Sequence, residues 1–70
     1  MTLKINSMYP TATGFIIPRS HANTDTGEKY CIVQVLTGDN VHYTSHHTTM
    51  SHKELRKALK LPAKERIETV

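Results

Sequence analysis

The stretch that decides the fold is YCIVQVL at residues 30–36, TGDN at 37–40 and VHYTSH at 41–46. The first segment is rich in β-branched and aromatic residues and is too short for an independent helix. Glycine, aspartate and asparagine tolerate positive φ, so residues 37–40 favour a tight turn. The stretch therefore predicts a β-hairpin, with residues 41–46 as the returning strand.

The register of this hairpin decides which side chains share a face. A turn centred on Gly38 and Asp39 places Cys31 opposite His46 and Val35 opposite His42. Cys31, His42 and His46 then lie on one face. A turn of another length would change these pairs, so they are conditional on the register.

Two further strands are predicted before the hairpin. Leu3 and Ile5 alternate with polar neighbours, and residues 14–17, GFII, form a β-branched and aromatic run that Pro18 closes. Tyr9 and Pro10 are expected to interrupt the chain between these strands. Residues 19–28 contain almost nothing apolar, which predicts a mobile surface loop.

A helix is predicted after the hairpin. Ser51 and Glu54 match the Ser-x-x-Glu capping box, and apolar residues follow them at helical spacing. The residue before a proline disfavours helical backbone, so Leu61–Pro62 should end this helix. We expect it over about 52–60, within a basic helical segment that spans 52–64. Residues 63–70 form either a short last strand or a tail.

Together these elements predict one small α+β domain over residues 1–70. It has an antiparallel sheet of three to five strands, open or barrel-like, and one C-terminal amphipathic helix. The order is β-β-β-β-α, with or without a final strand.

Length and composition exclude several classes of protein. Seventy residues leave no room for a multidomain enzyme, and a single cysteine cannot close an internal disulfide. No run approaches the ~20 apolar residues of a membrane helix, and the first seven residues lack a signal-peptide core. We therefore expect a cytoplasmic protein with no membrane partner. A single core of this size supplies only about 3–5 kcal/mol, so a homo-oligomer is one way to add stability.

The net charge of +3 is concentrated in one part of the chain. Residues 1–50 are neutral overall, and residues 51–70 carry the whole excess. Cations near a helix C-terminus are also favoured by the helix dipole, which explains part of the pattern. Five of these cations form a predicted basic stripe: Lys53, Arg56, Lys57, Lys60 and Lys64. If the stripe is a binding surface, its partner is an acidic protein patch or a phosphate backbone.

Two further sets of side chains are candidates for binding. Phe15, Tyr30 and Tyr43 lie on predicted strands, where aromatic rings can stack on single-stranded bases. Cys31, His42 and His46 have the chemistry of zinc ligands, but a structural zinc site needs four ligands at close spacing. We predict no cofactor and assign no catalytic residue.

The leading hypothesis is a small non-enzymatic regulatory or inhibitory protein that docks to a protein partner. Accessory factors encoded by viruses or plasmids are often of this type. The alternative is a nucleic-acid-binding module that uses the basic helix and the strand aromatics. A metal site on the central hairpin is the third hypothesis.

Overall fold

The computed structural model describes residues 1–38 and 41–69. The α+β class and the order of strands before a C-terminal helix are confirmed, with one more short strand than predicted. The elements are β1 (Thr2–Leu3), β2 (Tyr9–Thr11), β3 (Gly14–Asn23), β4 (Lys29–Gly38), β5 (Tyr43–Ser51), α1 (His52–Ala58) and β6 (Glu68–Thr69).

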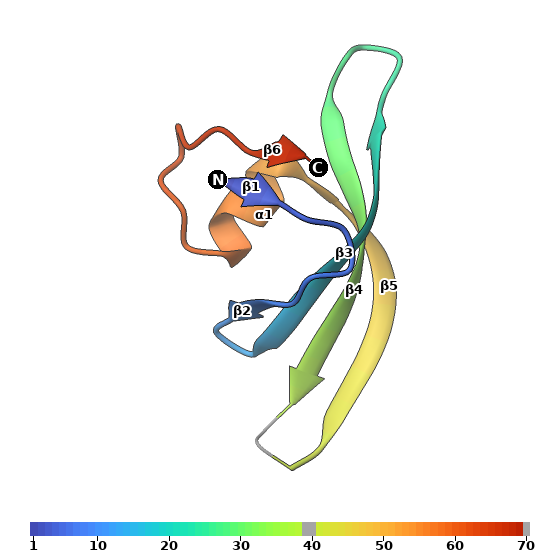
Figure 1. The fold of residues 1–70 in the computed structure, drawn as a ribbon, viewed down its shortest axis with the longest axis vertical. Coiled ribbons are helices and arrows are strands. Elements are labelled where there is room, and N and C mark those ends of the chain that lie inside the picture. Colours follow the sequence, from blue (N-terminus) through green and yellow to red (C-terminus); the bar gives the residue numbers. More distant parts are fainter. Residues whose placement is uncertain (39–40, 70) are drawn as a thin grey trace.

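Strands β2 to β5 form a four-stranded antiparallel sheet in chain order, whereas β1 and β6 form a separate parallel pair. Figure 1 shows β1, α1 and β6 gathered on one side of the long strands β3, β4 and β5. We call the sheet face on that side the inner face and the opposite one the outer face. Of the alternatives for residues 63–70, the short last strand is correct for Glu68–Thr69, which pairs with β1.

The start of the chain differs from prediction. The first strand covers only Thr2–Leu3, because the chain turns at Asn6, which has a φ of 68°. Pro10 does not interrupt the chain but lies inside β2, opposite Phe15 of β3. Proline is tolerated there because β2 is an edge strand.

The predicted loop over 19–28 is wrong for its first half, because β3 does not end at Pro18. A β-bulge between Pro18 and Ser20 accommodates the proline within the strand, and the strand continues to Asn23. The connection to β4 is a short turn in which the Thr24 amide donates to the Glu28 carbonyl at 2.8 Å. Gly27, with a φ of 82°, supplies the left-handed residue of this turn. The predicted mobility of the segment stays a prediction.

The β4–β5 hairpin exists, but its register differs from the predicted one. Gly38 pairs with Tyr43, so the connection is longer than a turn centred on Gly38 and Asp39. Asp39 and Asn40 of the predicted turn lie outside the described residues. Cys31 consequently faces Met50, and Val35 faces His46. The shift is an even number of residues, so each strand residue keeps the predicted face while its partner changes.

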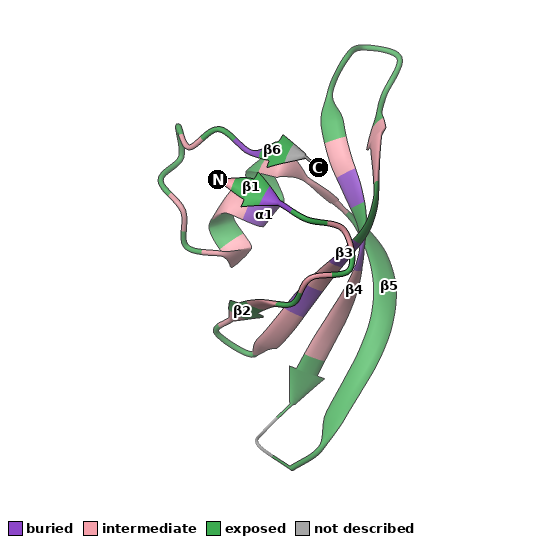
Figure 2. Ribbon diagram, viewed as in Figure 1, coloured by how far each residue is buried: buried purple, intermediate pink, exposed green. Residues whose placement is uncertain are grey.

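The core lies between the inner face of the sheet and α1 (Figure 2). The helix contributes one buried residue, Leu55, which is 0% exposed. Its N-terminus is capped as predicted: the Ser51 hydroxyl accepts from the Glu54 amide at 3.2 Å. The buried hydrophobic residues of the core are Leu3, Ile16, Cys31, Val33, Leu55 and Ile67.

The helix ends at Ala58, two residues earlier than the predicted 60 and well before 64. The Leu61 amide donates to the Arg56 carbonyl at 2.8 Å, and the Lys60 amide donates to the Lys57 carbonyl at 3.3 Å. These two bonds form a Schellman motif, in which Lys60 takes the left-handed position with a φ of 56°. Within the described part of the chain, no helix has the length and apolar content to cross a bilayer.

Candidate functional site: an exposed sheet edge beside a groove

Strand β5 forms one edge of the four-stranded sheet and pairs with β4 alone among the described strands. Its nine residues, YTSHHTTMS, include no lysine, arginine, aspartate, glutamate, proline or glycine. Residues 43–49 are all exposed. Sheet edges are usually protected by charged residues, proline or a covering element, because their backbone groups can pair with another strand. β5 carries no such charge or proline.

The outer face of the sheet presents apolar and aromatic side chains. Ile32 is 41% exposed and Tyr43 is 43% exposed. The rings of Phe15 and Tyr43 lie 6.1 Å apart and are inclined by 50°. Tyr30 belongs to the same face, because it pairs with Ser51, and Ser51 lies an even number of residues from Tyr43 on β5. The predicted stacking residues therefore share one face, and β1, α1 and β6 lie on the other side of the sheet (Figures 1 and 2).

Arg19, at the bulge of β3, is a cation on this outer face. Its guanidinium donates to the Asn6 side-chain oxygen at 2.6 Å and to the Gln34 side-chain oxygen at 2.7 Å. Both partners are neutral amides, so neither of these contacts neutralises the guanidinium charge. Arginine and tyrosine are enriched among the residues that dominate protein interfaces.

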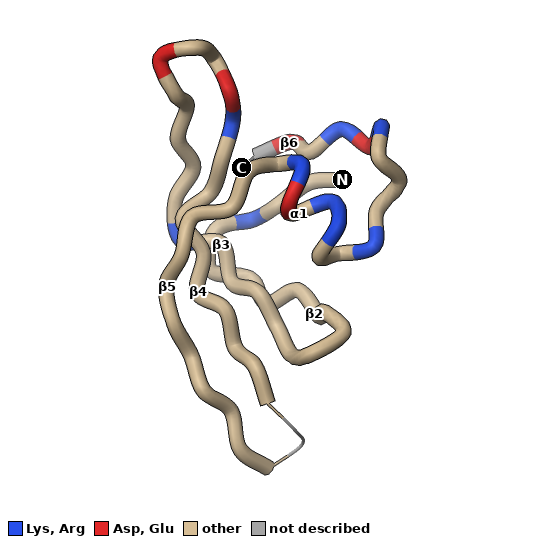
Figure 3. Tube along the Cα trace, turned by 180° about the vertical axis from the view of Figure 1, so that it is seen from behind, with Lys and Arg blue, Asp and Glu red and all other residues tan. Residues whose placement is uncertain are grey.

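The predicted basic stripe is not one continuous helical face. Lys53 and Lys57 are exposed on α1, whereas Lys60 and Lys64 lie in the segment after it. Arg56 is half-buried and donates from Nε to the Glu65 carbonyl at 3.0 Å, so it fastens that segment to the helix. Figure 3 shows the cations around α1 and the following segment, while β5 carries no charged residue.

The cations of the helix and two of the aromatic residues, Phe15 and Tyr43, lie on opposite sides of the sheet, whereas Tyr30 lines a hollow together with Lys29 and His52. The helix packs on the inner face through Leu55, and Phe15 and Tyr43 occupy the outer face. A single strand of nucleic acid cannot contact the helix cations together with Phe15 and Tyr43 without passing around the sheet. This separation weighs against the predicted nucleic-acid site that combines them.

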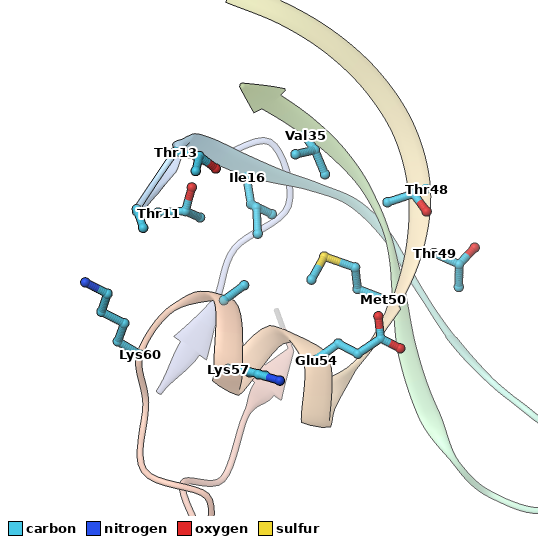
Figure 4. A pocket seen from close by; sticks show the side chains of 12 residues that line it. Thr11, Thr13, Ile16, Val35, Thr48, Thr49, Met50, Glu54, Lys57 and Lys60 are labelled. Carbon is cyan, nitrogen blue, oxygen red and sulfur yellow. The ribbon is translucent and has the colours of Figure 1, made fainter. Parts of the chain in front are cut away.

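A groove of about 420 Å³ lies between α1 and the β2–β3 hairpin, and sequence reasoning missed it. Figure 4 shows Ile16, Val35 and Met50 around its interior and Lys57 along its helical wall. Its lining comes from β2, β3, β4, β5 and α1 and from the segments that follow β2 and α1, so no local pattern indicates it. The groove also reaches Thr48 and Thr49 of β5, so it opens beside the exposed edge.

The structure does not bring the three predicted metal candidates together. His46 pairs with Val35, four positions from Cys31, which corresponds to about 13 Å along the strand. His42 precedes β5 and is exposed. Among the described residues, no three histidine, cysteine, aspartate or glutamate side chains are placed to hold a metal ion. The predicted pairing of Cys31 with His46 is wrong because it assumed a shorter turn.

Cys31 instead contacts His21, a residue of the predicted loop over 19–28 that lies on β3. His21 Nδ1 lies 2.9 Å from Cys31 Sγ, because the two residues pair across β3 and β4. Burial raises the pKa of the Cys31 thiol and lowers the pKa of His21. Both effects favour the neutral pair. A nucleophilic cysteine needs the opposite change, a lowered thiol pKa, so this geometry does not activate Cys31.

The other ring nitrogen of His21, Nε2, is buried and has no hydrogen-bond partner among the described residues. The Leu3 backbone lies near the His21 ring and raises its pKa, which partly opposes the larger effect of burial. His52 lies near this site. Burial lowers its pKa most, and the charges of Arg56, Lys29 and His21 lower it further.

We expect the free energy of unfolding to fall as the pH drops below about 6.5, the ordinary histidine pKa in an unfolded chain. His21 and His52 have lowered pKa values in the folded state, so below this pH the unfolded chain binds more protons. The contribution of the two histidines to the free energy of unfolding is fully present above about pH 6.5. It is lost as the pH falls from there through their lowered folded-state pKa values. Urea denaturation at pH 7.5, 6.5 and 5.5 measures it.

The matched control for this prediction is the double variant His21→Gln/His52→Gln. Its stability at pH 7.5 can differ from that of the native chain, but its pH dependence should be flatter over the same range. An unchanged slope in the double variant, or a native chain that is more stable at pH 5.5, would contradict the prediction.

Comparison with protein-family models, curated proteins and solved structures finds no match to this chain.

Proposed function

We propose that this protein is a small non-enzymatic regulator or inhibitor that docks to a protein partner by adding a strand of that partner to β5. The observation that carries the proposal is the edge itself: nine residues without charge or proline, and residues 43–49 exposed. In strand addition, backbone hydrogen bonds supply affinity and pockets beside the edge supply specificity. Regulators of the accessory type encoded by viruses or plasmids fit this description.

The distribution of charge supports a protein partner over a nucleic acid. Between Lys29 and Lys53 the sequence contains one charged side chain, Asp39, and it is acidic. Affinity for nucleic acid comes largely from cations that neutralise phosphates, and β4 and β5 offer few of them. The exposed side chains of Ile32 and Tyr43 on the outer face instead resemble the apolar and aromatic content of protein interfaces.

The basic surface around α1 has a supporting role in this proposal. Lys53, Lys57, Lys60 and Lys64 are exposed, and the short helix holds the first two beside the end of β5. Complementary charge raises association rates and orients partners. The partner should therefore be acidic near the contact. A cytoplasmic location, consistent with the free and buried Cys31, is part of the same proposal.

The test is affinity capture from nuclease-treated extract with native and edge-blocked protein, followed by mass spectrometry. In the edge-blocked variant, Ser45→Lys/His47→Lys, two lysines outside the groove protect the exposed strand in the way natural edges do. We expect the edge-blocked variant to recover at least tenfold less of a stoichiometric partner than the native protein does. The added charge would attract an acidic partner, so a loss cannot come from repulsion.

The control variant, Asn23→Lys/Thr26→Lys, adds the same charge at exposed positions away from β5. It should retain the partner. Equal recovery with the native and edge-blocked proteins would reject docking at β5. Recovery only without nuclease, together with an affinity for nucleic acid that falls steeply with salt, would favour the alternative function.

A further inference from the structure

The groove beside β5 has an apolar interior. Ile16 is buried at its base, and Val35, Met50 and Ala58 are half-buried around it. These residues come from β3, β4, β5 and α1. Its volume of about 420 Å³ lies in the range of sites that bind small organic groups. The interior therefore suits an apolar side chain better than a polar one.

The rim of the groove is polar and mainly cationic. Lys57 and Lys60 line it together with one carboxylate, Glu54. Glu54 accepts a hydrogen bond from the Ser51 hydroxyl at 3.3 Å, so it is engaged in capping α1. Neither lysine has an ion-pair partner within 4.0 Å among the residues that the structure describes. The rim consequently favours carboxylates next to the apolar group.

The position of the groove relates it to the exposed edge. Thr48 and Met50 point to the inner face of β5, since they pair with Val33 and Cys31 of the core. A strand added to β5 would extend the sheet and project every second side chain over the same inner face. Side chains two positions apart on that strand would thus reach the groove and its rim together.

We propose that the docked segment of the partner is an extended peptide with an apolar anchor and an aspartate or glutamate two residues away. The anchor enters the groove over Ile16 and Met50, and the carboxylate meets Lys57 or Lys60. This inference rests on the proposed strand addition at β5 and names the chemistry of the partner.

The experiment is a selection of random twelve-residue peptides displayed on phage, performed on the full chain and on the variant Lys57→Glu/Lys60→Glu. The native protein should enrich peptides with an apolar residue two positions from Asp or Glu. The variant should enrich Lys or Arg at that position instead. The synthetic peptide selected on the native protein should bind the variant at least tenfold more weakly.

Two further variants keep this test decisive. Lys53→Glu/Lys64→Glu makes the same change of charge at exposed lysines that do not line the groove, and it should keep the native preference. Lys57→Gln/Lys60→Gln removes the charge without reversing it, and its peptides should lose the acidic preference. Amide chemical shifts on titration with the selected peptide should change along β5 and, around the groove, at Thr11, Val35 and Ala58.

Three outcomes would overturn the inference. They are the absence of enriched peptides, a sequence preference unchanged by Lys57→Glu/Lys60→Glu, and chemical-shift changes confined to the outer face. None of these outcomes decides the proposed function, because the edge-blocked variant tests strand addition at β5 independently of the side chains that the groove binds. If the edge-blocked variant loses the partner and any of the three outcomes is also found, docking at β5 is supported. The apolar anchor with a neighbouring carboxylate is then rejected.

Discussion

Replacing Leu55 with alanine is expected to remove about 2–5 kcal/mol from the free energy of unfolding. Leu55 is 0% exposed and is the one residue of α1 that is buried in the core. A single core in a chain of this size supplies only about 3–5 kcal/mol in total. The variant should therefore be largely unfolded or melt far below the native protein. Circular dichroism with urea and thermal denaturation measures the change.

The size of this effect follows from the length of α1. The helix has seven residues, and isolated helices of fewer than ~12 residues are marginal in water. Its contact with the sheet through Leu55 therefore keeps it folded, and with it one wall of the groove. Lys53→Ala, on the exposed side of the same helix, should change stability by less than about 0.5 kcal/mol. Equal effects of the two substitutions would show that α1 does not depend on this contact.

The two ends of this helix show which signals the sequence holds. Its start was predictable, because Ser51 and Glu54 form a cap that involves only neighbouring residues. Its end was not, because the left-handed position is occupied by Lys60, where a glycine would have marked it. Local side-chain chemistry predicts an element boundary only when the residue at that boundary is the usual one.

The extent of β3 shows how one strong signal obscured another. Pro18 suggested the end of a strand, but the bulge that follows it depends on pairing with β4. The turn at 24–28 has a usable signature, since Gly27 follows polar turn residues and takes a positive φ. Weighing that turn as a hairpin connection would have extended β3 and placed His21 opposite Cys31.

The candidate site was predictable only in its parts. Local patterns predict that the basic residues are exposed, and four of the five are. Local patterns also predict that the three aromatic residues lie on strands, and all three do. The groove and the separation of Phe15 and Tyr43 from the helix cations depend on how β2, β3 and α1 pack together. Register errors of a few residues decide such questions, as the change of the Cys31 partner from His46 to Met50 shows.

Replacing Gly14 with alanine is expected to cost about 3 kcal/mol or more, the upper end of the usual cost of overpacking and a large loss for a small domain. A β-carbon at Gly14 would collide with the carbonyl oxygen of Leu36 and lie 2.9 Å from its carbonyl carbon. Both atoms belong to the backbone of β4, so no side-chain rotation relieves the contact. The β3–β4 pairing would have to separate at the end that positions Phe15 beside Tyr43.

The matched control is Gly27→Ala, which makes the same substitution at another glycine with positive φ. Nothing lies within 4 Å of a β-carbon at Gly27, so only the backbone conformation is penalised there, by about 1–2 kcal/mol. Urea denaturation of both variants separates the cost of conformation from the cost of collision. If Gly14→Ala were no more destabilising than Gly27→Ala, the close approach of β3 to Leu36 would be wrong. The hairpin end that carries Phe15 would then lie elsewhere, and the contact between Phe15 and Tyr43 on the outer face would be wrong with it.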